Sequence, residues 1–285
     1  MHSPKTECPL CRKKEWEILF RLDEFNIVRC RPCGLIFRDV FLTADSSKDL
    51  YSERYFTDEQ AGYFFNNPRE KEELFNARMD TVQAYVPLKG TLLDIGCAIG
   101  TFLNIARGRG WNARGSEISE FAAGYARDKH GLDVVSGEFD KTKFGNEKFD
   151  VVTLWDVIDH SEDPVTFLND AASLLKPGGY LFVLTTMEDS LIYEISKYLY
   201  KFSFGLIRGP VAKGHPIHHS TFFSKKTLKS AIESLGMRVR NIEPSKYPAT
   251  FFPGGFLSKM VFGALSGIGD VAGKPLEVTF ICQKR

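Results

Sequence analysis

The sequence predicts an α/β protein: a doubly wound parallel sheet preceded by a small metal-stabilised ribbon. Strand-like and helix-like segments alternate from Thr91 to Thr186, and this alternation favours a parallel sheet covered by helices on both faces. Before this region stand two Cys-x-x-Cys pairs, a spacing typical of metal ligands. With 285 residues, the chain is long enough for one large domain and a small appendage.

The two cysteine pairs predict a zinc ribbon over residues 1–45. Two thiolates three residues apart reach one tetrahedral ion, and a second pair completes a closed four-sulfur site. The predicted ligands are Cys8, Cys11, Cys30 and Cys33. A closed site leaves no position for a substrate, so we expect a structural zinc that substitutes for a hydrophobic core. Iron in a rubredoxin-like centre is the alternative with the same spacing.

Residues 46–88 are predicted to form a helical linker or cap. Apolar side chains recur at mostly helical spacing from Glu70 to Tyr85. The upstream segment Tyr51–Phe56 is aromatic and amphipathic, so it either covers a ligand or packs against the next domain.

The main domain is predicted to span residues 89–285. Ser119, Asp163 and Ser224 are expected helix N-caps, and Lys176–Gly179 (Lys-Pro-Gly-Gly) is an expected turn. The expected strands are Thr91–Ile95, Asn112–Glu117, Val134–Val135, Phe149–Trp155, Tyr180–Thr186, Met237–Ile242 and Leu276–Cys282, and the expected helices are Thr101–Arg109, Ser119–Lys129, Asp163–Leu175 and Ser224–Leu235.

Two aromatic insertions, near residues 188–220 and 248–274, are the expected lids, because long insertions in α/β loops tend to form binding elements. The first contains Leu191–Ile207, which is apolar nearly all round and places Lys197 and Lys201 one turn apart. We favour a lid or pocket wall here. A dimer face and a membrane-surface helix are the alternatives.

The composition argues against a nucleic-acid partner and against disorder. The chain has 37 Lys and Arg against 36 Asp and Glu, and 43% of its residues are hydrophobic. No apolar run approaches the ~20 residues that cross a bilayer, and the N-terminus lacks the apolar core of a signal peptide. Paired metal-ligand cysteines suit a reducing compartment, so we expect a cytoplasmic protein without disulfides.

The segment Leu92–Gly100 (Leu-Leu-Asp-Ile-Gly-Cys-Ala-Ile-Gly) predicts a ligand site where a buried strand enters a helix. Such a turn presents backbone N–H groups to a ligand. Dinucleotide sites need Gly-x-Gly-x-x-Gly, whereas this turn has only Gly96 and Gly100, with Asp94 two residues before them, which argues against NAD. Glu117, at the end of the second strand, is placed to accept hydrogen bonds from both ribose hydroxyls of an adenosyl ligand.

Two further segments fall on the same rim, at the carboxyl ends of the strands. Glu138 and Phe139 follow the third strand and are expected to bracket an adenine ring. Trp155–Pro164 (Trp-Asp-Val-Ile-Asp-His-Ser-Glu-Asp-Pro) follows the fourth strand.

In their order and spacing, the Asp-Ile-Gly-Cys-x-x-Gly loop, the acidic end of the second strand, the Asp-Val-x-x-His-x-x-Asp-Pro stretch and the Lys-Pro-Gly-Gly turn resemble a class I S-adenosylmethionine (SAM)-dependent methyltransferase. The resemblance covers roughly Leu74 to Arg285. It implies a Rossmann-like seven-stranded sheet in the order 3-2-1-4-5-7-6, with the last strand antiparallel.

The resemblance also implies that SAM is the cofactor, held at its methionyl part by Gly96 and Gly100 and at its ribose by Glu117. Ala98 stands where many members have a third glycine, and alanine fits if φ is negative there. The full set expected to bind the cofactor is Asp94, Gly96, Gly100, Glu117, Glu138, Phe139 and Trp155.

A four-cysteine module on such a domain resembles two subgroups: methyltransferases of sugar and polysaccharide biosynthesis, and certain ribosomal-RNA methyltransferases. Residues 1–38 carry eight Lys and Arg against five Asp and Glu, a small basic bias for a protein that neutralises phosphates. We therefore favour a small-molecule acceptor, such as a nucleotide-linked sugar. An RNA methyltransferase and a non-catalytic SAM-binding scaffold are the alternatives, and the oligomeric state stays open.

Three histidines are the candidate catalytic residues, because methyl transfer needs an aligned acceptor and, for a hydroxyl, removal of its proton. His160 follows the fourth strand and is the first candidate base. His218 and His219, with His215, form a second cluster expected to contact the acceptor or to serve in acid–base work. A metal site is less favoured there, because no carboxylate partner is evident at a matching spacing.

Overall fold

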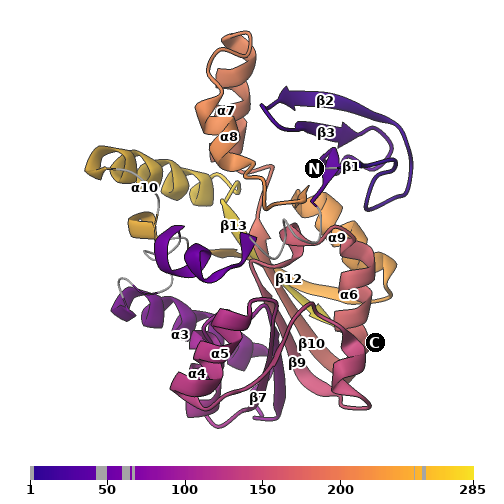
Figure 1. Cartoon of the computed structure of the whole chain (residues 1–285), viewed down its shortest axis with the longest axis vertical. Coiled ribbons are helices and arrows are strands. Elements are labelled where there is room, and N and C mark those ends of the chain that lie inside the picture. The colour runs from indigo at the N-terminus through magenta and orange to yellow at the C-terminus, as the bar shows by residue number, and fades with distance from the viewer. Residues whose placement is uncertain (1–2, 43–49, 60–64, 66–67, 247, 252–254) are drawn as a thin grey trace.

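The computed structural model describes residues 3–42, 50–59, 65, 68–246, 248–251 and 255–285, and its centre is one seven-stranded sheet (Figure 1). The strands in spatial order are β12 (Arg238–Ser245), β13 (Glu277–Gln283), β10 (Leu175–Thr186), β9 (Phe149–Trp155), β6 (Thr91–Ile95), β7 (Asn112–Glu117) and β8 (Asp133–Ser136). All neighbours are parallel except β13, which is antiparallel to both β10 and β12. The expected strand order is therefore confirmed.

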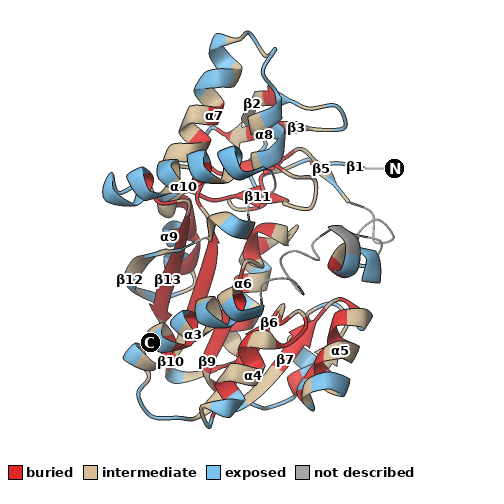
Figure 2. Cartoon of the chain, turned by 90° about the vertical axis from the view of Figure 1, so that its left-hand side faces the viewer, coloured by how far each residue is buried: buried red, intermediate tan, exposed pale blue. Residues whose placement is uncertain are grey.

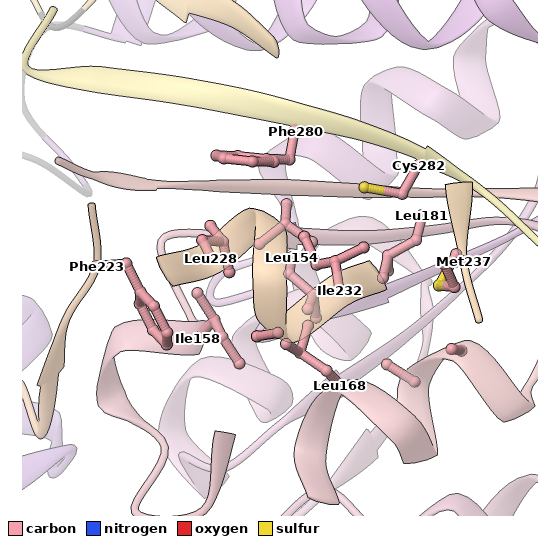
Figure 3. Packing of buried hydrophobic residues seen from close by; sticks show 14 of the residues in the cluster. Leu154, Ile158, Leu168, Leu181, Phe223, Leu228, Ile232, Met237, Phe280 and Cys282 are labelled. Carbon is pink, nitrogen blue, oxygen red and sulfur yellow. The ribbon is translucent and has the colours of Figure 1, made fainter. Parts of the chain in front are cut away.

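Helices cover both faces of this sheet. On one face lie α3 (Pro68–Tyr85), α4 (Thr101–Gly108) and α5 (Glu120–His130), whose apolar side chains join one core cluster. On the other face lie α6 (Pro164–Ser173) and α9 (Lys225–Ser234). Figure 3 shows Leu168 and Ile232 from these two helices packed together with Leu154 and Phe280 from the sheet. Each face of the sheet thus buries an apolar stripe of its helices.

The helix starts follow the expected capping residues. The side-chain oxygen of Ser119 accepts a hydrogen bond from the Ala122 N–H, and Asp163 accepts one from the Thr166 N–H. Ser224 forms a reciprocal capping box at the start of α9.

The Lys-Pro-Gly-Gly segment corrects one expectation. It lies inside β10 as an irregularity and not in a turn ahead of the strand, because β10 begins at Leu175. Its pairing with β9 shifts register between Leu175 and Tyr180. Pro177 has no N–H for the ladder and Gly178 has a φ of 76°, so both suit a bulge. The preceding helix, α6, accordingly ends at Ser173, two residues earlier than expected.

The N-terminal ribbon shares a sheet with the main domain. Its strands β2 (Trp16–Arg21), β3 (Asn26–Cys30) and β4 (Ile36–Arg38) form an antiparallel sheet, and β4 pairs further with β11 (Thr221–Phe222). The two-residue strand β11 directly follows the second histidine segment. The ribbon is therefore attached next to the candidate catalytic residues.

The remaining described elements are short or lie in the two insertions. Within the described residues, no helix combines the length and hydropathy needed to cross a bilayer. These elements are β1 (Ser3–Pro4), β5 (Val40–Phe41), η1 (Tyr55–Glu59), η2 (Lys141–Phe144), η3 (Ile158–His160), α7 (Leu191–Phe202), α8 (Gly209–Gly214), η4 (Ala249–Phe251) and α10 (Phe256–Val271).

Candidate active site

The glycine loop after β6 has the conformation expected of a ligand cradle. Gly96 has a φ of 74° and Gly100, the N-cap of α4, a φ of 81°. A Cβ atom at Gly96 would lie 2.5 Å from a methyl carbon of Val157, so no other residue fits without a shift. The backbone of this turn therefore requires glycine at Gly96 on both conformational and steric grounds.

Ala98 corrects a second expectation, because its φ is positive, at 49°. Its N–H donates to Glu117 Oε2 at 2.8 Å. This hydrogen bond holds the peptide in the left-handed region that glycine would adopt more readily.

Glu117 ends β7 and is buried beneath this loop. Its Oε1 accepts a hydrogen bond from the Ser119 N–H at 2.9 Å, in addition to the bond from Ala98. Burial raises the pKa of Glu117, and the two backbone N–H groups oppose that rise. A carboxylate has about four lone-pair positions, so acceptor capacity remains for a ribose diol.

Carboxylates gather at the carboxyl edge of the sheet, where Asp94 and Glu277 are buried and Asp156 is half-buried. Asp94 accepts a hydrogen bond from the Thr153 hydroxyl at 2.6 Å, and burial raises its pKa to about 7. Asp156 lies 3.4 Å from the Arg78 guanidinium, and burial raises its pKa to about 6. Burial also raises the pKa of Glu277, on β13. Such a concentration of acids beside one guanidinium suits a cationic ligand, and SAM carries a sulfonium and an ammonium group.

The residues expected around the adenine lie in different environments. Glu138 is exposed, and the Phe139 ring packs 5.1 Å from the Phe167 ring. Trp155 is buried, with its ring 5.2 Å from that of Phe102 and the Arg78 guanidinium 5.3 Å above it. The Trp155 side chain therefore packs in the core beside the loop, and the contacts of these residues with a cofactor stay a prediction.

The structure joins His160, His218 and His219 into one cluster. The His160 ring stacks on the His218 ring at 5.4 Å, and it lies 4.7 Å from the His219 ring. His219 Nε2 is 3.2 Å from Asp159 Oδ2, whereas His160 Nε2 is 3.9 Å from the same oxygen. No carboxylate partner for these histidines was evident from spacing, but the fold supplies Asp159, which directly precedes His160 in the chain and lies beside His219.

Tyr51 closes one side of this cluster, since its hydroxyl is 2.6 Å from His160 Nδ1. The aromatic segment upstream of the main domain thus lies over the site, while Phe56 from the same segment is buried against Ile99. Asp159, His160 and His219 also place three potential ligand atoms within 4.8 Å of one another, a set that a divalent cation can use.

His215 does not belong to this cluster. It is buried, with Nε2 at 3.3 Å from Glu188 Oε2 and Nδ1 at 2.9 Å from the Val211 carbonyl oxygen. It therefore braces α8 against the loop after β10.

Two of the clustered imidazoles, those of His218 and His219, are neutral at pH 7. Burial lowers the pKa of His218 to about 3, and His160 and Arg38 lower it further. Burial, together with His160, also lowers the pKa of His219. A neutral imidazole keeps one ring nitrogen as a proton acceptor.

A buried ionic network connects the ribbon to the site. No local sequence pattern predicts this network. Arg38, from β4, donates to Glu162 and to the Ile217 carbonyl oxygen. Lys5 donates to Ser220 Oγ at 2.7 Å and lies 2.8 Å from Glu162. Glu162 and Ser220 each stand within two residues of a site histidine, so the ribbon holds both histidine segments.

The four ribbon cysteines have the geometry of a tetrahedral metal site. Their sulfur atoms all lie within 4.8 Å of one another, with Cys8 to Cys33 at 3.6 Å and Cys11 to Cys30 at 3.4 Å. Zinc–sulfur bonds of about 2.3 Å place tetrahedral sulfurs about 3.8 Å apart, so the set fits zinc.

A family comparison agrees with this geometry, because residues 68–242 match the family model described as a methyltransferase domain. The chain belongs to this methyltransferase family. The matched region contains the glycine loop, Glu117 and the histidine cluster.

The curated proteins to which this chain is similar include ubiquinone biosynthesis O-methyltransferases. The protein from Ralstonia nicotianae is 30% identical over 132 residues, which are 44% of this chain and 55% of that protein. The protein from Caulobacter vibrioides is 38% identical over 110 residues, 36% of this chain and 43% of that protein. The chain thus spans about half the length of the curated relatives it matches.

Solved structures share the fold at low identity. A SAM-dependent methyltransferase from Archaeoglobus fulgidus matches with a TM-score of 0.54 and 20% identity, covering 81% of this chain and all of that one. Magnesium protoporphyrin IX methyltransferase from Synechocystis with bound SAH matches with a TM-score of 0.58 and 16% identity, covering 84% and 98%.

Proposed function

We propose that this methyltransferase transfers the methyl group of SAM to a hydroxyl group of a small-molecule acceptor. The observation that carries the proposal is the pairing of Asp159 with His219 on the rim that also carries the glycine loop. Membership of the family and the O-methyltransferase relatives support it.

When bound, SAM supplies an electrophilic methyl group on a positively charged sulfur. In this proposal the Gly96–Gly100 backbone receives the methionyl part, and Glu117 accepts hydrogen bonds from the ribose. Asp94 and Asp156 offset the positive charge of the cofactor. These groups bind and orient, so the remaining task is to remove the acceptor proton.

His219 is the proposed base. Asp159 accepts from its Nε2–H side at 3.2 Å, and Nδ1 is buried with no hydrogen-bond partner among the described residues. Nδ1 is therefore available to an acceptor hydroxyl, and the carboxylate stabilises the imidazolium that forms. His160, joined to Tyr51, and His218 are proposed to position the acceptor.

The acceptor is proposed to be a compact hydroxylated ring, because the site is walled by aromatic and imidazole rings. The Tyr55 ring lies 6.4 Å from the His218 ring and 5.4 Å from the Tyr51 ring. Flat walls of this kind suit a saccharide ring or a phenol. The nucleotide-linked sugar stays a prediction, and the O-methyltransferase relatives add hydroxylated aromatic compounds to the candidates.

The test is S-adenosylhomocysteine formation with a panel of nucleotide sugars and hydroxylated aromatic compounds. With the best acceptor, His219→Gln should lower kcat by roughly 10²–10⁴-fold, the usual contribution of a general base, with SAM affinity nearly unchanged. Asp159→Asn should lower kcat in the same way. His218→Gln is the matched control, and it should raise KM more than it lowers kcat.

Three results would contradict the proposal. Turnover of His219→Gln near the wild-type rate would show that His219 is not the base. A second contradicting result would be loss of activity with a chelator and its recovery with a divalent cation, while the ribbon keeps its zinc throughout. This result would favour metal-assisted transfer at Asp159, His160 and His219. SAM binding without turnover on any acceptor would favour a scaffold.

A further inference from the structure

Exposed apolar side chains are concentrated in two segments. Among the described residues, twelve of the fifteen large apolar side chains that are exposed lie in Tyr198–Ile207 and Phe256–Val271. The first segment ends α7 and continues toward α8, and the second is α10. In Figure 1 these helices extend outward from the sheet, and Figure 2 shows exposed surface along both. Such a concentration marks an interaction surface.

The turn after α7 presents its apolar side chains on a defined backbone. Phe202, Phe204 and Leu206 are 73%, 95% and 86% exposed. Phe204 has a φ of 53°, a left-handed conformation that is unfavourable for a residue with a Cβ. The turn is nevertheless closed by backbone hydrogen bonds, including Gly205 N–H to the Tyr200 carbonyl oxygen at 2.9 Å. This exposed aromatic tip is therefore an ordered feature.

The helix α10 carries its apolar stripe on the outward side. Phe262 and Gly269 are its buried positions, and a Cβ at Gly269 would lie 3.4 Å from Leu191, at the start of α7. Lys274 links the two helices further, since its carbonyl oxygen accepts from the Leu191 N–H and its Nζ lies 2.5 Å from Glu194. The start of α7 and the end of α10 are thus held together. The exposed apolar positions of α10 are Phe256, Leu257, Met260, Val261, Ile268 and Val271.

The two segments, taken together with the residues that flank them, are positively charged, although the chain as a whole is nearly neutral. Residues 191–214 contain four Lys and Arg and one Glu, and residues 255–274 contain two Lys and one Asp. The formal charge of both together is +4, against +1 for the chain, so the remainder carries −3. Lys201 and Arg208 flank the aromatic tip and are exposed, and the Arg208 guanidinium also lies 3.6 Å from the carboxylate of Asp23 in the ribbon. This charge favours a negatively charged partner.

We propose that the tip of α7 and the outward stripe of α10 insert into the headgroup and acyl boundary of a bilayer that contains anionic lipids. Aromatic and aliphatic side chains bordered by Lys and Arg suit that boundary. A second copy of the chain fits less well, because a twofold contact would place the same positive patch against itself. Neither helix crosses the bilayer, so the attachment is peripheral.

The test is sedimentation of the full chain with phosphatidylglycerol–phosphatidylcholine vesicles and with vesicles of phosphatidylcholine alone. The wild-type chain should bind the anionic vesicles, and salt should weaken this binding. The triple variant Phe202→Ser, Phe204→Ser, Leu206→Ser should bind at least about tenfold more weakly. Leu88→Ser is the matched control: Leu88 is 83% exposed but lies outside both segments, so its loss should change nothing.

An unchanged melting temperature of the triple variant excludes misfolding as the cause, since the three side chains are exposed. The proposal is overturned if wild-type chain does not bind anionic vesicles, or if the triple variant binds as the wild type does. It is also overturned if ultracentrifugation shows a dimer that the triple variant loses while vesicle binding is absent. The last result would assign the surface to a second copy.

Discussion

At the residue scale, the glycine loop after β6 contains an alanine at a position whose backbone conformation favours glycine. Ala98 has a φ of 49°, and its N–H is fixed by Glu117 at 2.8 Å. The loop therefore retains the hydrogen bond that shapes the site while carrying the steric cost of a Cβ in the left-handed region.

Ala98→Gly should stabilise the protein. The conformational strain removed at position 98 exceeds the free-energy cost of the more flexible unfolded chain by about 0.5–1 kcal/mol. This gain in the free energy of unfolding corresponds to a rise in melting temperature of about 1–4 °C. SAM affinity should change less than about twofold, because the N–H donor remains. Thermal denaturation and calorimetry check both statements. A lower melting temperature would show that packing of the alanine methyl group outweighs its strain.

We expect SAM binding to depend on pH through Asp94. Its pKa of about 7 leaves it roughly half protonated at neutral pH. A cationic ligand favours the carboxylate, so binding should release a proton, and affinity should rise as pH increases from about 6 to 8. Calorimetry in buffers of different ionisation enthalpy measures this release. Asp94→Asn should lack it near pH 7, with only the contribution of Asp156 left near pH 6. Equal proton release in both proteins would contradict this assignment.

Single residues differ in how far the sequence predicts their position. Gly96, Gly100 and Glu117 follow strands directly, so a local pattern located them on the rim. The partnership of Asp159 with His219 joins segments sixty residues apart, and only the folded chain brings them together. His215 was grouped with His219 on proximity in sequence, but its ring faces Glu188 instead.

At the element scale, long periodic segments were predictable and short ones were not. The strands and capped helices from β6 to β10 were predicted in kind and order because each has its own apolar pattern or N-cap, whereas the end of α6 and the start of β10 differ from expectation. By contrast, β11 has two residues, too few for any periodicity. Its pairing with β4 depends on where the ribbon lies, which no local pattern records. This unpredicted strand is nevertheless what joins the ribbon to the histidine segment.

At the scale of the whole molecule, the proposed cofactor side and the proposed acceptor side of the site depend on different structural supports. The glycine loop and Glu117 rest on β6, β7 and the helices that pack beside them. The histidine cluster rests on the ribbon, through the Arg38 and Lys5 contacts with Glu162 and Ser220. Ribbon residues such as Cys8 and Phe37 also belong to the core cluster of the opposite sheet face. We therefore expect that loss of the metal predicted for the ribbon would disturb the proposed acceptor side first.

The Cys30→Ser variant tests this dependence. Freshly purified wild-type chain should contain one tightly held metal, expected to be zinc, and the variant should lose it. Because the Ser220 N–H donates to the Asp159 carbonyl oxygen at 2.8 Å and the Arg38 N–H donates to Ser220, amide exchange over residues 216–222 should quicken at least about tenfold. SAM affinity should change by less than about threefold, while turnover falls by at least about tenfold.

Cys282→Ser is the matched control for this variant, because Cys282 is a buried cysteine of β13 that is not among the four clustered sulfurs. It should keep the metal and the slow exchange of residues 216–222. Elemental analysis, hydrogen exchange and calorimetry supply the measurements. If Cys30→Ser loses its metal while residues 216–222 stay protected, the ribbon does not support the histidines. If SAM binding is lost together with the metal, the two sides of the site share one structural support. A ribbon that acts only through Glu162 and Ser220 would leave the glycine loop in place and would preserve SAM binding.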